Sequence, residues 1–115
     1  FACEADSLIP GGTHQVRMEF AYDGGGLAKG GDVTLYYDGN AVGHGRVEAT
    51  QAMIFSADET TDIGYESGTT VTPDYTARSS RFNGKIHWVQ LDTGVDDNDH
   101  YIDPDERFRV AMARQ

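Results

Sequence analysis

Four carboxylates in one polar stretch are the side chains best suited to chemistry in this sequence. They are Asp58, Glu59, Asp62 and Glu66. Glycoside hydrolases use such a pair, with one carboxyl as general acid and the other as base or nucleophile. A chain with a formal net charge of −10 contains many acidic pairs that have no catalytic role. We therefore expect no hydrolysis here and interpret the four residues as facing a partner, or its substrate, from a long loop over residues 56–75.

Other residues with ligand or nucleophile chemistry are not spaced for a site. Asp97 and Asp99 match the first positions of an EF-hand loop, but the glycine and distal glutamate that complete it are missing. A solvated connection is therefore favoured over calcium binding. The four histidines show no spacing typical of zinc ligands, and Cys3 lies in a segment without clear pattern. The sequence predicts no catalytic residue, no metal and no cofactor.

The charge balance limits the classes of partner. Nineteen acidic residues stand against nine basic ones, so a nucleic acid or an anionic membrane surface would be repelled. No apolar run approaches the roughly 18 residues that span a bilayer. The single cysteine excludes an internal disulfide. We expect a soluble chain, with the cytoplasm slightly favoured over secretion.

The elements that must position these residues are strands, and the clearest signal is a hairpin over residues 31–47. Val33, Leu35 and Tyr37 alternate with polar neighbours, which is typical of a half-buried strand. The turn follows at Asp38-Gly39, where both residue types accept positive φ. Two glycines in the second strand, at 43 and 45, either bend it or let another backbone come close.

Further strands are predicted on either side of the hairpin. Residues 13–22 alternate, and we expect the apolar set to point inward. Residues 53–55 form a short apolar run, and residues 81–92 carry apolar side chains on both faces, which indicates a central strand covered on both sides. The inward set of the first strand is Val16, Met18, Phe20 and Tyr22.

One helix is expected, over residues 104–115. Asp103 is the predicted N-cap, Pro104 occupies the first helical position and Glu106 completes a capping box. Together these patterns predict an all-β fold, an antiparallel two-sheet sandwich with one short C-terminal helix, forming a single domain over residues 1–115.

Much of the chain resembles the C-terminal region of bacterial arylsulfatases. The run VRMEFAYDGGGL with the following KGG and VTLY carries the resemblance, and later segments agree in order. In addition, Phe82, Gly84, Ile86, Val89 and Leu91 are similar in spacing to a strand motif of laminin-G and concanavalin-like sandwiches. The later arylsulfatase-like segments are DG at 38–39, GRV at 45–47, FSADET at 55–60, DIG at 62–64, GT at 68–69, DY at 74–75, IDPDER at 102–107 and RVAMARQ at 109–115.

The resemblance implies sulfate-ester hydrolysis for the family but not for these residues. Sulfatases act through a cysteine in a Cys-x-Pro/Ser-x-Arg motif, whereas Cys3 is followed by EADS. The resemblance therefore implies a non-catalytic domain, either a fragment or a stand-alone relative. Such a domain would pack on a catalytic domain absent from this chain and shape the mouth of its active site.

The function and the partner each have an alternative that stays open. A stand-alone carbohydrate-binding sandwich module would use an aromatic platform, for which the candidates are Tyr36, Tyr65 and Trp88. The expected partner is a sulfatase catalytic domain or a second copy of the chain. A homodimer would form by pairing edge strands or by exchanging the segment around Leu8 and Ile9.

Overall fold

The computed structural model describes residues 1–52, 60–94, 101, 103–105, 109 and 112. Its residues fall into two compact units, one made of Phe1–Ala52 with Val95–Gln115 and the other of Met53–Gly94. We describe each unit by itself, and the predicted single domain stays a prediction. Within the described part of the chain, no helix has the length and apolar character needed to cross a membrane.

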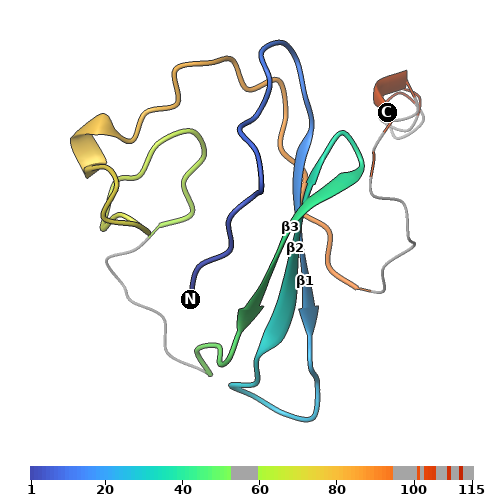
Figure 1. The fold of residues 1–115 in the computed structure, drawn as a ribbon, viewed down its shortest axis with the longest axis vertical. Coiled ribbons are helices and arrows are strands. Elements are labelled where there is room, and N and C mark those ends of the chain that lie inside the picture. The colour runs from blue at the N-terminus through green and yellow to red at the C-terminus, as the bar shows by residue number, and fades with distance from the viewer. Residues whose placement is uncertain (53–59, 95–100, 102, 106–108, 110–111, 113–115) are drawn as a thin grey trace. The chain divides into compact units, whose positions relative to one another are not determined.

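The first unit contains a three-stranded antiparallel sheet (Figure 1). Its strands are β1 (Val16–Tyr22), β2 (Gly31–Tyr37) and β3 (Asn40–Val47), with β2 in the centre. The β1–β2 register is regular from end to end, with Phe20 opposite Val33. The antiparallel β fold that the alternation predicts is confirmed at this level.

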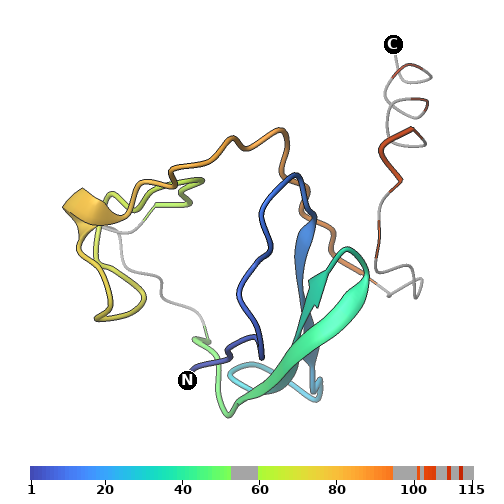
Figure 2. The ribbon, with the colours of Figure 1, turned by 45° about the horizontal axis from the view of Figure 1, so that its top comes forward.

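The predicted hairpin is also confirmed. Asp38 and Gly39 have φ values of 50° and 83°, the backbone of a two-residue type I′ turn, whose twist matches that of the strands it joins. The hairpin made by β2 and β3 twists visibly along its length (Figure 2). Asparagine at position 40 closes the turn by donating from Nδ2 to the carbonyl oxygen of Tyr37, at 3.4 Å.

A β-bulge interrupts β3 and lets the N-terminal segment attach to it. Leu35 lies opposite Gly43 and Tyr36 opposite Ala41, which leaves Val42 as the extra residue. The backbone N–H of Asp6 donates to the carbonyl oxygen of Val42, at 2.7 Å. The N-terminal segment, residues 3–7, is therefore held against β3.

The two glycines of β3 have the second of their two predicted roles, close approach of another backbone. A Cβ at Gly43 would lie 2.6 Å from the carbonyl oxygen of Glu4, and one at Gly45 would lie 2.7 Å from the Cβ of Cys3. Real Cβ atoms do not approach other atoms so closely, so these positions admit the N-terminal segment only as glycine.

The predicted inward face of β1 is wrong in one respect. Its apolar side chains do share the face of Val33, because Met18 lies opposite Leu35 and Phe20 opposite Val33. The N-terminal segment, however, lies over β3 on that face, and Val33, 7% exposed, is the single buried hydrophobic residue among those described. The four β1 side chains remain exposed: Val16 by 56%, Met18 by 65%, Phe20 by 40% and Tyr22 by 44%.

The polar face of β1 is the less exposed one. The side chains of Arg17 and Glu19 are 27% and 20% exposed, and Arg17 Nε lies 2.8 Å from Glu19 Oε1. Alternation correctly groups the side chains by face, but the more solvent-exposed face is the apolar one.

The second unit has little regular structure in its described residues, 60–94. The one element there is a 3-10 turn, η1 (Ala77–Ser79), whose N-cap Thr76 forms a capping box with Ser79. The prediction of a central strand over residues 81–92 is wrong: the chain there is irregular, and Ile86, Val89 and Leu91 are exposed. An extended segment becomes a strand only when another strand pairs with it, and residues 60–94 contain none. The predicted strand at 53–55 lies outside the described residues.

The region of the predicted C-terminal helix is described at four positions. Pro104, Asp105, Arg109 and Met112 have helical backbone. Oδ1 of Asp103 accepts from the backbone N–H of Asp105, at 2.8 Å, which is the contact of an N-cap residue. The rest of that range, with the predicted capping partner Glu106, lies outside the described residues.

Candidate functional site

The most prominent surface of the first unit is an apolar row on β1, here named the β1 stripe, made of the side chains of Val16, Met18, Phe20 and Tyr22. All four project from one face of an edge strand and are between 40% and 65% exposed. The rings of Phe20 and Tyr22 lie side by side, with centroids 6.3 Å apart and planes at 49°. A row of exposed apolar side chains beside a small core indicates a surface made to be covered.

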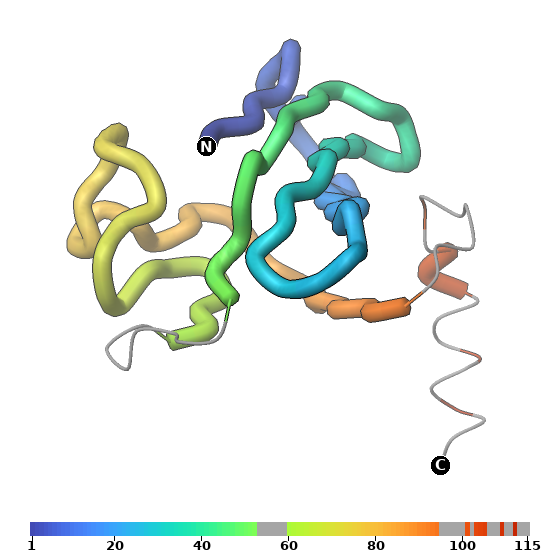
Figure 3. Tube along the Cα trace, turned by 90° about the horizontal axis from the view of Figure 1, so that it is seen from below, coloured from blue at the N-terminus to red at the C-terminus, as the bar shows by residue number. Residues whose placement is uncertain are grey.

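The loop that joins β1 to β2, residues 23–30, follows an open arc (Figure 3). The hydroxyl of Tyr22 bridges this arc. That hydroxyl donates to the carbonyl oxygen of Gly26 and accepts from the backbone N–H of Lys29, at 3.1 Å. The carbonyl oxygen of Lys29 in turn accepts from the N–H and the hydroxyl of Thr50. The three successive glycines of this loop, Gly24–Gly26, all have positive φ. They make turns in a strand connection.

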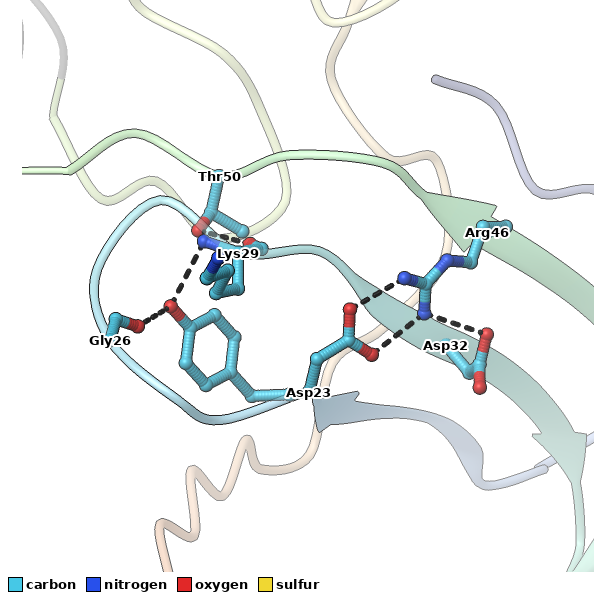
Figure 4. A network of polar contacts seen from close by, with 7 residues as sticks. Asp23, Gly26, Lys29, Asp32, Arg46 and Thr50 are labelled. Atoms are coloured by element: carbon cyan, nitrogen blue, oxygen red, sulfur yellow. Dashed lines mark hydrogen bonds and ion pairs between the residues drawn. The ribbon is translucent and has the colours of Figure 1, made fainter.

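An arginine clamp ties the two edge strands together across β2 (Figure 4). Arg46 of β3 holds Asp23, just beyond β1, through two hydrogen bonds of 2.8 and 2.5 Å, and Asp32 of β2 through one of 3.2 Å. Arg46 lowers the pKa of the Asp23 carboxyl, chiefly through these hydrogen bonds. Conversely, Asp23 and then Asp32 raise the pKa of Arg46.

This clamp is structural rather than a binding site for an anion. A sulfate or phosphate group needs a cation with free hydrogen-bond donors, whereas Arg46 meets two carboxylates and is neutralised by them. What the clamp can do is fix the end of β1 relative to the hairpin.

A second polar cluster joins the hairpin turn to the beginning of β1. Oδ1 of Asp38 accepts from the backbone N–H of Gln15, at 2.9 Å, and its Oδ2 lies 2.6 Å from Nδ1 of His14. Nε2 of His14 lies 2.9 Å from the carbonyl oxygen of Gly11. The hydrogen bond to Asp38, and then that to Gly11, raises the pKa of His14. The N–H of Gln15 and then His14 lower the pKa of Asp38.

The His14–Asp38 pair resembles part of a catalytic triad but lacks its chemistry. In a triad the second ring nitrogen accepts from a nucleophilic hydroxyl or thiol. Here both ring nitrogens face acceptors, a carboxylate and a carbonyl oxygen, so these contacts favour the protonated imidazole, which donates from both, and raise the pKa of His14. A doubly protonated imidazole cannot serve as a general base, and the pair acts as a clasp on the turn.

The clasp predicts a pH dependence of stability. Because the folded pKa of His14 is raised above 6.5, its contribution is fully present below that value and is lost as pH rises through the folded pKa. Because the folded pKa of Asp38 is lowered, its contribution to stability is present above the ordinary carboxyl pKa. That contribution is lost as pH falls through the folded pKa of Asp38. We expect wild type and His14→Gln to differ most in thermal midpoint between about pH 4.5 and 6.5, and to converge at alkaline pH.

The matched variant for this test is Asp38→Asn, because asparagine also accepts the positive φ of the turn. NMR titration should show the pKa of His14 falling toward its ordinary value in this variant. An unchanged His14 pKa would contradict the ion pair.

The structure places two of the four predicted acidic residues, and both are engaged within their own loop. Asp62 accepts from the hydroxyl of Thr60, at 2.8 Å, and from the N–H and hydroxyl of Ser67, at 2.8 and 2.9 Å. The N–H of Ser67 is the main cause of its lowered pKa. Glu66 lies beside Tyr75, whose pKa is raised by burial and then by a hydrogen bond to Glu66. Asp58 and Glu59 lie outside the described residues.

The three predicted platform aromatics are divided between the two units. Tyr36 lies in β2, whereas Tyr65 and Trp88 lie in the unit Met53–Gly94. The guanidinium carbon of Arg81 lies 5.6 Å from the centroid of the Tyr65 ring, a cation–π contact that occupies one face of that ring. A sugar would have to use its other face.

Metal and thiol chemistry receive no support from the described side chains. Among them, no three His, Cys, Asp or Glu residues come together as a metal site would require. Cys3 is half-buried against Gly45, and His14 is engaged with Asp38 and Gly11 rather than with the thiol.

The chain matches no protein-family model, no curated protein and no solved structure. The resemblance to arylsulfatases therefore stays a prediction, and function is argued from the surface of this chain. The exposure of the β1 stripe and the clasp at His14 were not foreseen. One feature of the sequence could have predicted the contact between the turn and the start of β1. If the strand ending at Tyr22 pairs with the strand that begins at Gly31, Gln15 lies opposite Asp38.

Proposed function

We propose that this chain is the non-catalytic C-terminal β-sandwich domain of an arylsulfatase-like sulfuric ester hydrolase. In this role it packs on the catalytic domain and shapes the mouth of the active site. The observation that carries the proposal is the β1 stripe, an exposed apolar row on a sheet whose described residues include one buried hydrophobic side chain, Val33.

The β1 stripe gains free energy when it is covered. A Val, Met or Phe side chain gains about 1.5–3 kcal/mol on going from exposed to fully buried. A packing partner therefore stabilises the sheet by several of these increments, less the cost of association. In the two-sheet sandwich that the sequence predicts, a second sheet or the catalytic domain provides that cover.

The polar clusters of the described residues support a structural role for this chain. Arg46 is neutralised by Asp23 and Asp32, and His14 is held by Asp38. Asp62 is satisfied within its own loop. None of these groups offers an activated nucleophile or a free cation for sulfate, so the chemistry belongs to the partner. The loop that carries Asp58, Glu59, Asp62 and Glu66 would then lie beside that partner's substrate.

The test is binding to an arylsulfatase catalytic domain from which its own C-terminal region has been removed. We expect a complex by size exclusion and light scattering, and Met18→Lys or Phe20→Lys should weaken it by about tenfold or more, as for a central apolar contact. The matched control is Leu91→Lys, which changes an exposed apolar residue in the other unit, outside the loop over residues 56–75.

Two outcomes would contradict the proposal. One is binding that is equally sensitive to Leu91→Lys and Met18→Lys, since the β1 stripe would then have no special role. The other is turnover of a chromogenic aryl sulfate by the purified chain alone, persisting in Cys3→Ala, since the chain itself would then be an enzyme.

A further inference from the structure

The backbone of β1 presents hydrogen-bonding groups on one open edge. The carbonyl oxygen of Gln15 accepts from Asp38 N–H, at 2.9 Å, and Asp23 N–H donates to Gly30 O, at 3.0 Å. Residues of an antiparallel strand bond to its neighbour alternately, so the odd-numbered residues of β1 bond to β2. The N–H and C=O groups of the even-numbered residues, those of the β1 stripe, point away from β2. Within the described sheet, β1 is the outermost strand on that side.

The two edges of the sheet differ in how they are protected. Natural sheets protect an edge with bulges, prolines or a covering segment. β3 has two of these devices, the bulge at Val42 and the N-terminal segment bonded to it through Asp6. β1 has neither a proline nor a bulge, and its seven residues keep an unbroken register with β2. A regular, uncovered edge of this kind is suited to pairing with another strand.

The charges on β1 favour a second copy of β1 as that strand. In a two-fold antiparallel pair centred on Met18, each Arg17 lies opposite Glu19 of the other copy, and Val16 lies opposite Phe20. Moving the centre by one residue in either direction places Glu19 opposite Glu19 or Arg17 opposite Arg17. Opposite charges stabilise a cross-strand pair and like charges destabilise it, so of these three registers the one centred on Met18 is favoured. Arg17 and Glu19 contact each other within each chain, so the pairing would form an alternating cluster of four charges.

We infer that this chain forms a homodimer through its β1 edges, joining two three-stranded sheets into one antiparallel sheet of six strands. The backbone edge and the β1 stripe are different surfaces of the same strand. The inference therefore does not depend on the proposed function, and the continuous sheet would present two stripes side by side on one face.

The first test is the oligomeric state of the full chain and of charge variants. At about 100 µM, where a dimer with a micromolar dissociation constant is mostly associated, light scattering should give the mass of two chains. Arg17→Glu alone, or Glu19→Arg alone, should weaken the dimer by about tenfold or more, because both cross-strand pairs become repulsive. A mixture of the two single variants should form a heterodimer, and the double variant should regain the wild-type affinity.

Rescue in the mixture and in the double variant also shows that the changed chains fold. A strict monomer at that concentration would overturn the inference. So would a dimer whose affinity is the same in wild type and both single variants, because that dimer would use another surface, such as the segment around Leu8 and Ile9.

The second test is a cross-link that reads the register. In a Cys3→Ala background, Met18→Cys places two thiols on directly opposite residues, with Cα atoms about 5.5 Å apart, within the range of a disulfide. Val16→Cys is the matched control on the same face. Its two copies are offset by four residues, roughly 14 Å along the strands. We expect at least about tenfold more cross-linked dimer from Met18→Cys under mild oxidation, and equal yields would overturn the register.

Discussion

Replacing Gly30 with alanine is expected to lower the free energy of unfolding of the sheet by about 2–3 kcal/mol, the usual cost of overpacking. Gly30 is buried at the entry to β2. A Cβ there would lie 2.3 Å from the carbonyl oxygen of Val47 and 2.7 Å from that of Glu48. Both contacts are backbone atoms, so no side-chain rotation can relieve them. The end of β3 must move away from β2 instead.

The backbone around Gly30 has little freedom to make that movement. Its carbonyl oxygen accepts from Asp23 N–H, and the carbonyl oxygen of the preceding Lys29 accepts from Thr50 N–H, at 3.1 Å. Moving β3 therefore strains contacts on both sides. The measurement is urea unfolding followed by circular dichroism of the sheet. The control is Gly11→Ala, where the new methyl group has no atom within 4 Å and φ is ordinary. We expect that change to be within about 0.5 kcal/mol of wild type, and similar losses in both variants would contradict the steric argument.

Replacing Gly43 with alanine is expected to release the N-terminal segment while the three strands stay paired. The new Cβ would lie 2.6 Å from the carbonyl oxygen of Glu4 and 3.1 Å from the Cα of Ala5. The N-terminal segment has one backbone hydrogen bond to β3, from Asp6 to Val42, so it is the part that yields. We expect a loss of about 1–3 kcal/mol and rapid hydrogen exchange at the Asp6 amide.

A deletion provides the decisive control for this second prediction. In a chain without residues 1–7 the clash cannot occur, and alanine in a strand is better than glycine by about 0.5–1 kcal/mol. Gly43→Ala should therefore destabilise the full chain and slightly stabilise the shortened one. A loss of the same size in both chains would mean that the glycine is needed by the bulge itself rather than by the N-terminal segment.

The parts of the fold that could be predicted from sequence are those determined by neighbouring residues. The hairpin follows from a turn whose two residues accept positive φ, Asp38 and Gly39, between two alternating runs. β1 follows from its own alternation, although it begins at Val16 rather than at residue 13. At that end Gln15 bonds to the turn residue Asp38, through its N–H to the carboxylate and through its carbonyl oxygen to the backbone N–H, so the predicted strand begins beside the turn rather than beside β2.

The parts that could not be predicted depend on what lies against a segment. Alternation shows which side chains of β1 share a face, but it contains no information on which face is covered, and here Phe20 remains 40% exposed. Residues 81–92 have the composition of a strand and no strand to pair with among residues 60–94. The N-terminal segment has no periodicity at all, so its attachment at Val42 had no signal beyond the two glycines.

The candidate site was foreseen only in part for a related reason. A carboxylate in a polar loop bonds either to a partner or to its own loop, and spacing alone does not decide between them. Asp62 bonds to its own loop, by accepting from the N–H and the hydroxyl of Ser67. His14 and Asp38 are 24 positions apart and meet because of the β1–β2 register. A long-range pair of this kind becomes predictable only when the β1–β2 register is known, and the loop over residues 23–30 does not fix that register as a two-residue turn would.

The attachment of residues 3–7 to β3 has a consequence for the order in which this chain folds. A hairpin with a two-residue turn closes within microseconds, and β1 joins it across a short connection. The contact from Asp6 to Val42 spans 36 positions, and such distant contacts form late because the loop that they close costs more entropy. Residues 3–7 therefore reach their place only after the strand to which they attach has formed. Until then, the hairpin depends on its own turn to persist.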